Sequence, residues 1–130
     1  MKTELFYLTL TAAFTGLLWV PYVLDRFFVR GIPATVGYPD NPKPQSPWAQ
    51  RLKRAHANAV ENLVVFAALV LAANALGITG GAIATAAIVY FWARVAHAVV
   101  YAAGLPWLRT LAFTVAFFAQ ACVAWIILVR

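Results

Sequence analysis

The sequence predicts an all-α integral membrane protein, a bundle of four transmembrane helices with up-down topology. Of its 130 residues, 64% are hydrophobic and only 11% are charged, whereas a soluble domain carries roughly 45–50% apolar and about 25% charged residues. A chain this apolar cannot cover itself with polar surface, which excludes a soluble globule, and intrinsic disorder requires low hydrophobicity. The length predicts one domain over residues 1–130.

The gaps between charged residues predict the outer two spans. The gap from Glu4 to Asp25 and the gap from Arg109 to Arg130 each contain twenty uncharged residues, which is about the length of a helix that crosses a ~30 Å hydrocarbon core. A secretion signal is disfavoured for the first gap, because the apolar run is long and lacks a small-residue cleavage site.

A hairpin of two helices is predicted in the middle of the chain. The uncharged gap from Glu61 to Arg94 contains thirty-two residues, too many for one span, and the Gly-rich run at 76–81 is typical of a turn. We therefore expect spans at about 4–28, 52–76, 82–102 and 108–129.

The first connection, at about 29–51, is predicted to be a loop without room for a helix. It is rich in proline, which breaks helices, namely Pro33, Pro39, Pro42, Pro44 and Pro47. Most of the Lys and Arg residues lie in or beside this loop. Because positively charged loops stay in the cytoplasm, we expect the connections between spans one and two and between spans three and four there, and both termini outside. The short loops and the absence of a retention signal suit a bacterial inner membrane. The basic excess then favours contact with anionic membrane lipids, and no nucleic acid partner is expected.

Two stripes of polar side chains mark the cytoplasmic halves of the second and third spans. Each stripe follows helical spacing on one face: Arg54, Asn58 and Glu61 on one span, and Arg94, His97 and Tyr101 on the other. In an antiparallel hairpin, the sequence numbers of two residues at equal depth add up to a constant value. Three pairs give the same sum and are therefore expected at matching depths: Arg54 with Tyr101, Asn58 with His97, and Glu61 with Arg94. Glu61 and Arg94 are therefore expected to form an ion pair, because an unpaired charge at this depth costs at least about 2.5 kcal/mol. A purely structural ion pair is the alternative for these two residues alone.

The six polar residues together predict a pocket that opens toward the cytoplasm. Arginine holds carboxylates in a bidentate fork, and Arg109 lies nearby as a third arginine after Arg54 and Arg94. Glu61 can accept an ammonium group. The pattern favours a small zwitterionic ligand with more than one carboxylate, with an apolar second substrate supplied by the lipid. An ordinary helix–helix hydrogen bond is the alternative role for His97, and no metal site is expected because no third ligand accompanies the two histidines.

The segments 51–61 (RLKRAHANAVE) and 94–101 (RVAHAVVY), followed by Arg109 and Thr110, resemble the MAPEG family, the membrane-associated proteins in eicosanoid and glutathione metabolism. The similarity is greatest to the prostaglandin E synthase and microsomal glutathione transferase branches. The resemblance implies a homotrimer that binds glutathione, as co-substrate, between neighbouring subunits near the cytoplasmic side. Arg109 would stabilise the glutathione thiolate. The residues that would bind glutathione are Arg26 or Arg30, Arg54, Asn58, Glu61, Arg94, His97, Tyr101 and Thr110.

Three positions depart from the family pattern. Ala57 replaces an arginine of some members, Phe113 replaces a tyrosine of several, and Thr110 replaces a serine. The expected function is a glutathione transferase or peroxidase acting on lipophilic electrophiles or lipid hydroperoxides. Two alternatives remain: a non-catalytic lipid- or glutathione-binding membrane protein, which Ala57 and Phe113 favour, and a small proton-coupled exporter that uses Glu61. Pairing of Glu61 with Arg94 would argue against the exporter.

Overall fold

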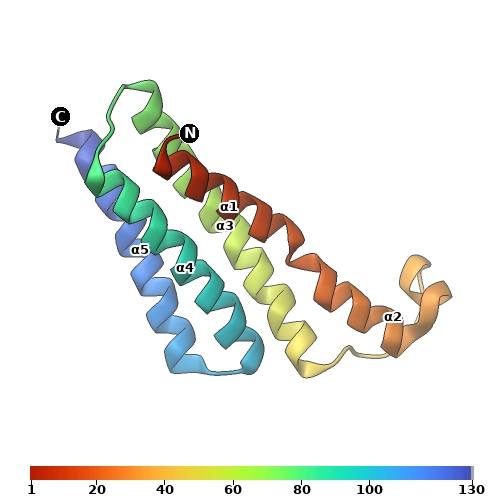
Figure 1. Cartoon of the computed structure of the whole chain (residues 1–130). Coiled ribbons are helices and arrows are strands. Elements are labelled where there is room, and N and C mark those ends of the chain that lie inside the picture. Colours follow the sequence, from red (N-terminus) through yellow and green to blue (C-terminus); the bar gives the residue numbers. More distant parts are fainter. Residues whose placement is uncertain (130) are drawn as a thin grey trace.

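The computed structural model describes residues 1–129, which form five helices and no other regular elements (Figure 1). The helices are α1 (Thr3–Leu17), α2 (Trp19–Val36), α3 (Pro47–Ala75), α4 (Gly81–Ala103) and α5 (Pro106–Leu128). α1 and α2 follow one another with only Leu18 between them, so the described chain has four stretches long and apolar enough to cross a membrane. The prediction of an all-α membrane chain with four long apolar helices is confirmed.

The two ends of the bundle differ in what they carry (Figure 1). α1 begins and α5 ends at the same end as the α3–α4 turn at 76–80, which we call the turn end. The other end, which we call the loop end, carries segment 37–46 and the α4–α5 connection at 104–105. The far part of α2 projects away from the other helices there.

The prediction of a loop over all of 29–51 was wrong at both of its edges. Helical structure continues to Val36, and α3 already begins at Pro47, so the irregular segment is confined to 37–46. Gly31 breaks the α2 helix with φ +78°, a conformation that favours glycine, and Pro33 then lies in the short helical stretch after this kink. Pro47 occupies the start of α3, where a missing N–H costs nothing. Pro47 thus begins a helix and Pro33 lies inside α2, whereas Pro39, Pro42 and Pro44 lie in the irregular segment.

The core is built where α1, α3, α4 and α5 meet. Phe66 of α3 stacks on Tyr90 of α4, with ring centroids 3.8 Å apart and planes at 7°. Small residues such as Ala87 and Ala116 surround this stack and let the helix backbones approach closely, as is usual between membrane helices. Many large apolar side chains instead point outward, among them Trp92 and Phe118, because lipid is as good a solvent for them as a protein interior.

A hydrogen-bond network fastens α2 to the start of α3. The buried carboxylate of Asp25 accepts bonds from the backbone N–H of Ser46 (3.1 Å), from the Ser46 hydroxyl (2.5 Å) and from the Gln45 amide (3.2 Å). The Tyr22 hydroxyl also bonds to Nδ1 of His56, at 2.8 Å. These contacts fix segment 37–46 at its α3 side and so position the polar groups of the loop end.

Candidate functional site

A pocket of about 290 Å³ opens among α3, α4 and α5 in the loop-end half of the bundle. We call it the α3–α5 pocket. Its lining consists of Asn58, His97, Tyr101, Arg109, Thr110 and Phe113. The first five of these residues belong to the set predicted from the sequence, and three different helices bring them together.

The short α4–α5 connection brings Arg109 over the pocket. Gly104 has φ +79°, and a Cβ at this position would lie 3.2 Å from the Arg51 guanidinium carbon, so only glycine fits without displacement. The Nε of Arg51 donates to the Ala102 carbonyl at 2.9 Å and holds α3 against this connection. As α5 begins immediately afterwards, the Arg109 guanidinium carbon lies 4.7 Å from the centroid of the Tyr101 ring, within cation–π range.

The inner wall of the pocket is formed by His97 and its aromatic neighbours. The His97 ring centroid lies 5.4 Å from that of Tyr101 and 6.4 Å from that of Phe113. Only 2% of His97 is exposed, and its Nδ1 has no hydrogen-bond partner among residues 1–129. Thr110 donates its hydroxyl proton to the Pro106 carbonyl at 3.1 Å, so toward a ligand its oxygen acts as an acceptor. A buried histidine without a partner on one nitrogen is suited to a further hydrogen bond.

Arg94 lies buried behind the pocket and fixes the Asn58 amide. Its Nη2 donates to the Asn58 side-chain oxygen at 2.8 Å, and the Asn62 amide donates to the same oxygen at 3.3 Å. The Nε and Nη1 groups of Arg94 have no partner among the described residues. Because two donors occupy the Asn58 oxygen, the NH₂ group of Asn58 is the part of this amide left for a ligand.

The predicted ion pair between Glu61 and Arg94 is not formed. Glu61 is exposed on α3, whereas Arg94 is buried and bonded to Asn58. The sequence numbers predict how deep each residue lies along the hairpin, but they do not predict which way its side chain faces. The facing depends on the rotation of the helix about its axis. At about 100° per residue, Glu61 lies about 200° around α3 from the buried Ala59 and so faces away from α4. Pairing of Glu61 with Arg94 would have argued against a proton-coupled exporter, and this argument no longer holds. Glu61 nevertheless lies on an outer face of the chain, whereas an exporter would need it on an interior path.

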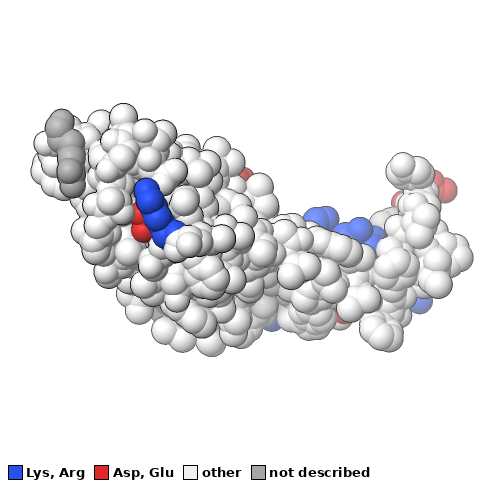
Figure 2. Space-filling model, turned by 45° about the horizontal axis from the view of Figure 1, so that its top comes forward, with Lys and Arg blue, Asp and Glu red and all other residues white. Residues whose placement is uncertain are grey.

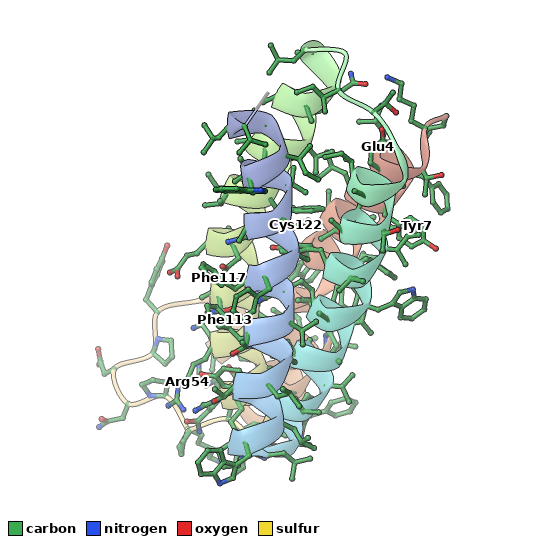
Figure 3. All side chains as sticks on the ribbon, turned by 90° about the vertical axis from the view of Figure 1, so that its left-hand side faces the viewer. Glu4, Tyr7, Arg54, Phe113, Phe117 and Cys122 are labelled. Atoms are coloured by element: carbon green, nitrogen blue, oxygen red, sulfur yellow. The ribbon has the colours of Figure 1, made fainter. Side chains whose placement is uncertain are left out.

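The other predicted arginines lie outside the α3–α5 pocket. Arg54 and Arg30 line a second pocket of about 340 Å³ near the start of α3, and Figure 3 shows Arg54 in the same half of the bundle as Phe113. Arg26 donates its Nε to the Gln45 side-chain oxygen at 3.2 Å. The structure thus places five residues of the predicted set in the α3–α5 pocket and two in the second pocket, whereas Arg26, Glu61 and Arg94 line neither.

Sequence reasoning missed the residues that organise the second pocket. Gln45 and Lys53 line it, and Asp25 holds Gln45 in place. A signal was available for Asp25, because an acidic residue among arginines, followed by a long Pro-rich connection, suggests a local anchor. No comparable signal marked Gln45. Among residues 1–129, no three His, Cys, Asp or Glu side chains lie together as metal ligands would.

Comparison with known proteins identifies the family of this chain. The model of the MAPEG family matches residues 7–129, which is nearly the whole chain. A search of curated proteins found no significant match. The chain therefore belongs to the MAPEG family.

Proposed function

We propose that this MAPEG protein is a glutathione-dependent membrane transferase or peroxidase that activates the glutathione thiol in the α3–α5 pocket. The observation that carries the proposal is the position of Arg109: it lines a pocket with Tyr101 and His97, in a helix that is otherwise apolar enough to span the membrane. Such a place gives access both to a water-soluble thiol and to a substrate dissolved in lipid.

The polar groups around the pocket suit the charges of glutathione. The free NH₂ of Asn58 and the guanidinium of Arg54, one helical turn earlier on α3, can donate to its carboxylates. Glu61 faces away from this pocket within one subunit, so it can accept the ammonium group only of a ligand that extends over the outer face of α3. His97, Tyr101 and Thr110 offer directional hydrogen bonds at fixed positions, and Arg94 acts from behind through Asn58. Neither Arg26 nor Arg30 is part of the pocket in one protomer.

An oligomer would complete the site. Glu61 is exposed on α3 together with apolar neighbours such as Val60 and Val64. A charge exposed to lipid at membrane depth costs at least about 2.5 kcal/mol, so covering this face with protein is favourable. We propose the homotrimer that family membership suggests, with glutathione between neighbouring subunits, the loop end in the cytoplasm and a bacterial inner membrane as the location.

The chemistry follows from the electrostatics of the thiol. A free thiol has a pKa of about 8.5 and is mostly protonated at neutral pH, but the thiolate is the nucleophile. A guanidinium nearby favours the anion and lowers that pKa by about one unit or more, and the released proton passes to water. In conjugation, the thiolate sulfur forms a bond to the electrophilic carbon while the leaving group departs with its electron pair. In peroxide reduction, the thiolate sulfur forms a bond to the terminal oxygen of the hydroperoxide, the O–O bond breaks, and the lipid alkoxide leaves and takes up a proton to become the alcohol. The thiol of a second glutathione then attacks the sulfur of the resulting sulfenic acid, which releases water and gives the disulfide.

Arg109→Ala provides the direct test. Protein purified in detergent is mixed with glutathione, and the thiolate is followed by its ultraviolet difference absorption. We expect the thiolate signal at neutral pH to fall about tenfold, which corresponds to one pKa unit, while calorimetry still detects glutathione binding. Lys43→Ala, which removes a positive charge outside the pocket, is the control. An unchanged thiolate signal in Arg109→Ala would contradict the assignment of Arg109.

A non-catalytic binding protein is the second candidate. Phe113 supports it, because this ring lines the pocket and offers no hydroxyl beside the sulfur, and Ala57 supports it by lacking a guanidinium. Turnover of 1-chloro-2,4-dinitrobenzene with glutathione separates the two candidates. Glutathione binding without any turnover of this electrophile or of a lipid hydroperoxide would favour the binding protein.

A further inference from the structure

The far part of α2 and the residues that follow it carry an apolar surface that the α3–α5 pocket does not use. We call residues 28–38 the projecting segment. Four of its large apolar side chains are strongly exposed: Phe28 (90%), Ile32 (68%), Val36 (71%) and Tyr38 (101%). Ile32 and Val36 are four residues apart in the short helical stretch after the kink, so they lie on one face of it. Exposure of such a surface to water is unfavourable, and it indicates an interaction with an apolar partner.

The conformation of the projecting segment is fixed by hydrogen bonds. The Thr35 hydroxyl donates to the Arg26 carbonyl at 3.2 Å, across the kink at Gly31. The backbone N–H of Gly37 donates to the Pro33 carbonyl at 2.9 Å. A Cβ at Gly37 would lie 2.8 Å from the same carbonyl oxygen, so this close turn requires glycine. The fold therefore holds the apolar side chains on the outside of the chain.

The lengths of the helices place the projecting segment relative to the membrane. At a rise of 1.5 Å per residue, about 20 residues cross the ~30 Å hydrocarbon core. Counted from Thr3, the first spanning stretch leaves the core near Leu24, and counted back from Ala75, α3 leaves it near Arg54. A straight helix would then carry Val36 about 18 Å beyond the core, well past a headgroup layer of about 6 Å.

The kink at Gly31 changes this course. Figure 1 shows that the chain after the kink bends back toward the side of the turn end and does not continue along the axis of α2. The short helical stretch therefore stays close to the membrane surface. Trp48, at the start of α3 on the same end of the bundle, is 41% exposed, and tryptophan is enriched at the level of lipid headgroups.

The charges around the projecting segment complement a membrane surface. From position 26 to position 43 the chain carries three cations and one acid, namely Arg26, Arg30 and Lys43 against Asp40. Figure 2 shows Lys and Arg atoms where the projecting end of the chain joins the helical body. Cations at this level can reach the phosphates of anionic lipids, while the apolar face meets the boundary of the acyl chains.

We propose that the projecting segment lies in the headgroup layer of the membrane, with its four apolar side chains against lipid. This is the arrangement of an interfacial amphipathic helix. Asp25 of α2 accepts hydrogen bonds from the backbone N–H and the hydroxyl of Ser46, so the contact with lipid also fixes the start of α3 relative to the membrane surface. The proposal does not depend on thiol activation in the α3–α5 pocket.

The test measures the surroundings of position 32 in vesicles of phosphatidylglycerol and phosphatidylcholine. Cys122, which is exposed, is first replaced by alanine, and Ile32→Cys is then labelled with a nitroxide. Asp40→Cys, two residues beyond the projecting segment, is the matched control, and both positions are exposed, so the label displaces no packed side chain. Collisions of the label with oxygen, which concentrates in lipid, are compared with collisions with a water-soluble nickel chelate. We expect the ratio of oxygen to nickel collisions to be about tenfold higher at position 32, since an apolar side chain of this size prefers an apolar phase to water by at least that factor.

Val36→Cys should repeat the result, because Val36 lies one turn further on the same face. Equal ratios at positions 32 and 40 would overturn the proposal and place the projecting segment in water. Low collision rates with both reagents at position 32 would also overturn it, because protein would then cover the segment, and broadening of the spectrum by a second nitroxide would identify another copy of the chain. The measurement needs no glutathione, so its outcome is independent of the thiolate signal in Arg109→Ala.

Discussion

The turn-end half and the loop-end half of the bundle are built from the same four membrane-spanning stretches, but their polar side chains differ. At the turn end, the polar side chains are few and partnered: Lys2 bonds to Asn74 at 3.0 Å, and Thr79 bonds to Glu4 at 3.2 Å. Figure 3 shows Glu4 at this end, far from Arg54. In the loop-end half, Nε and Nη1 of the buried Arg94 and Nδ1 of the buried His97 lack partners in the described chain. The Tyr90 hydroxyl and Oε1 of Gln120 also lack partners, but these two residues lie on the turn-end side of the middle of α4 and α5.

The open spaces of the two halves differ in the same way. Between α4 and α5, the turn-end half has an apolar groove of about 570 Å³, lined mainly by small and aliphatic residues. Cys122 is exposed in this groove. The α3–α5 pocket at the loop end is lined mostly by polar side chains. An unpaired buried polar group costs free energy, so stability alone would not select the unpaired groups of Arg94 and His97 in the loop-end half. This supports the proposal that the α3–α5 pocket is the functional site.

Two matched asparagine variants should show the largest difference in stability between the two halves. Asn58→Ala removes the hydrogen-bond partner of the buried Arg94 guanidinium, and we expect the free energy of unfolding to fall by about 2 kcal/mol. Asn74→Ala removes the partner of the exposed Lys2 and should cost no more than about 0.5 kcal/mol. Unfolding by SDS titration in mixed micelles measures both. Equal losses would show that the two halves are not different in kind.

Arg94→Met separates function from stability in the loop-end half. Burying a guanidinium without a counter-charge costs several kcal/mol, so this substitution should leave the free energy of unfolding unchanged or raise it. Loss of the contact that orients Asn58 should weaken glutathione binding about tenfold, since a hydrogen bond to a charged group contributes about 1.5 kcal/mol or more. Lys43→Met, which removes an exposed cation outside the pocket, is the control. Calorimetry that finds undiminished binding in Arg94→Met would contradict the role of Arg94.

Phe113→Tyr adds a hydroxyl group to the α3–α5 pocket and tests whether the reaction takes place there. A hydroxyl on this ring can donate to the thiolate, and a hydrogen bond of about 1 kcal/mol corresponds to about a fivefold gain in the rate of conjugation. Phe117→Tyr, one turn further along α5 on an exposed ring, should change nothing (Figure 3). A similar gain in both variants would place the reaction outside the α3–α5 pocket.

The smallest effect is expected at the turn end. Glu4→Gln keeps an acceptor for Thr79 and removes only the charge in the first turn of α1. It should lower the free energy of unfolding by about 0.5 kcal/mol, the usual contribution of an acid near a helix N-terminus. Glutathione affinity, measured by calorimetry, should stay the same. A change in affinity would connect the two halves and weaken the division between them.

The sequence alone predicted most of the residues that line the α3–α5 pocket, but not which polar side chains bond to one another. Helical spacing placed Asn58, His97 and Tyr101 on facing stripes, and all three line the α3–α5 pocket with Arg109. The same spacing paired Arg94 with Glu61, where the structure pairs it with Asn58. It also placed Arg54 with Asn58, whereas the exposed Arg54 lines the second pocket, near the start of α3.

Composition and the gaps between charges determined that this chain is a four-span membrane protein, because hydrocarbon thickness and helical rise fix the length of an apolar span. They could not determine the rotation of each helix about its axis, nor how the kink at Gly31 and the Asp25 network fold α2 back to α3. Those features depend on contacts between residues distant in sequence. Only the packed bundle decides which polar side chains share a pocket, and it does so by bringing the small residues of neighbouring helices into contact.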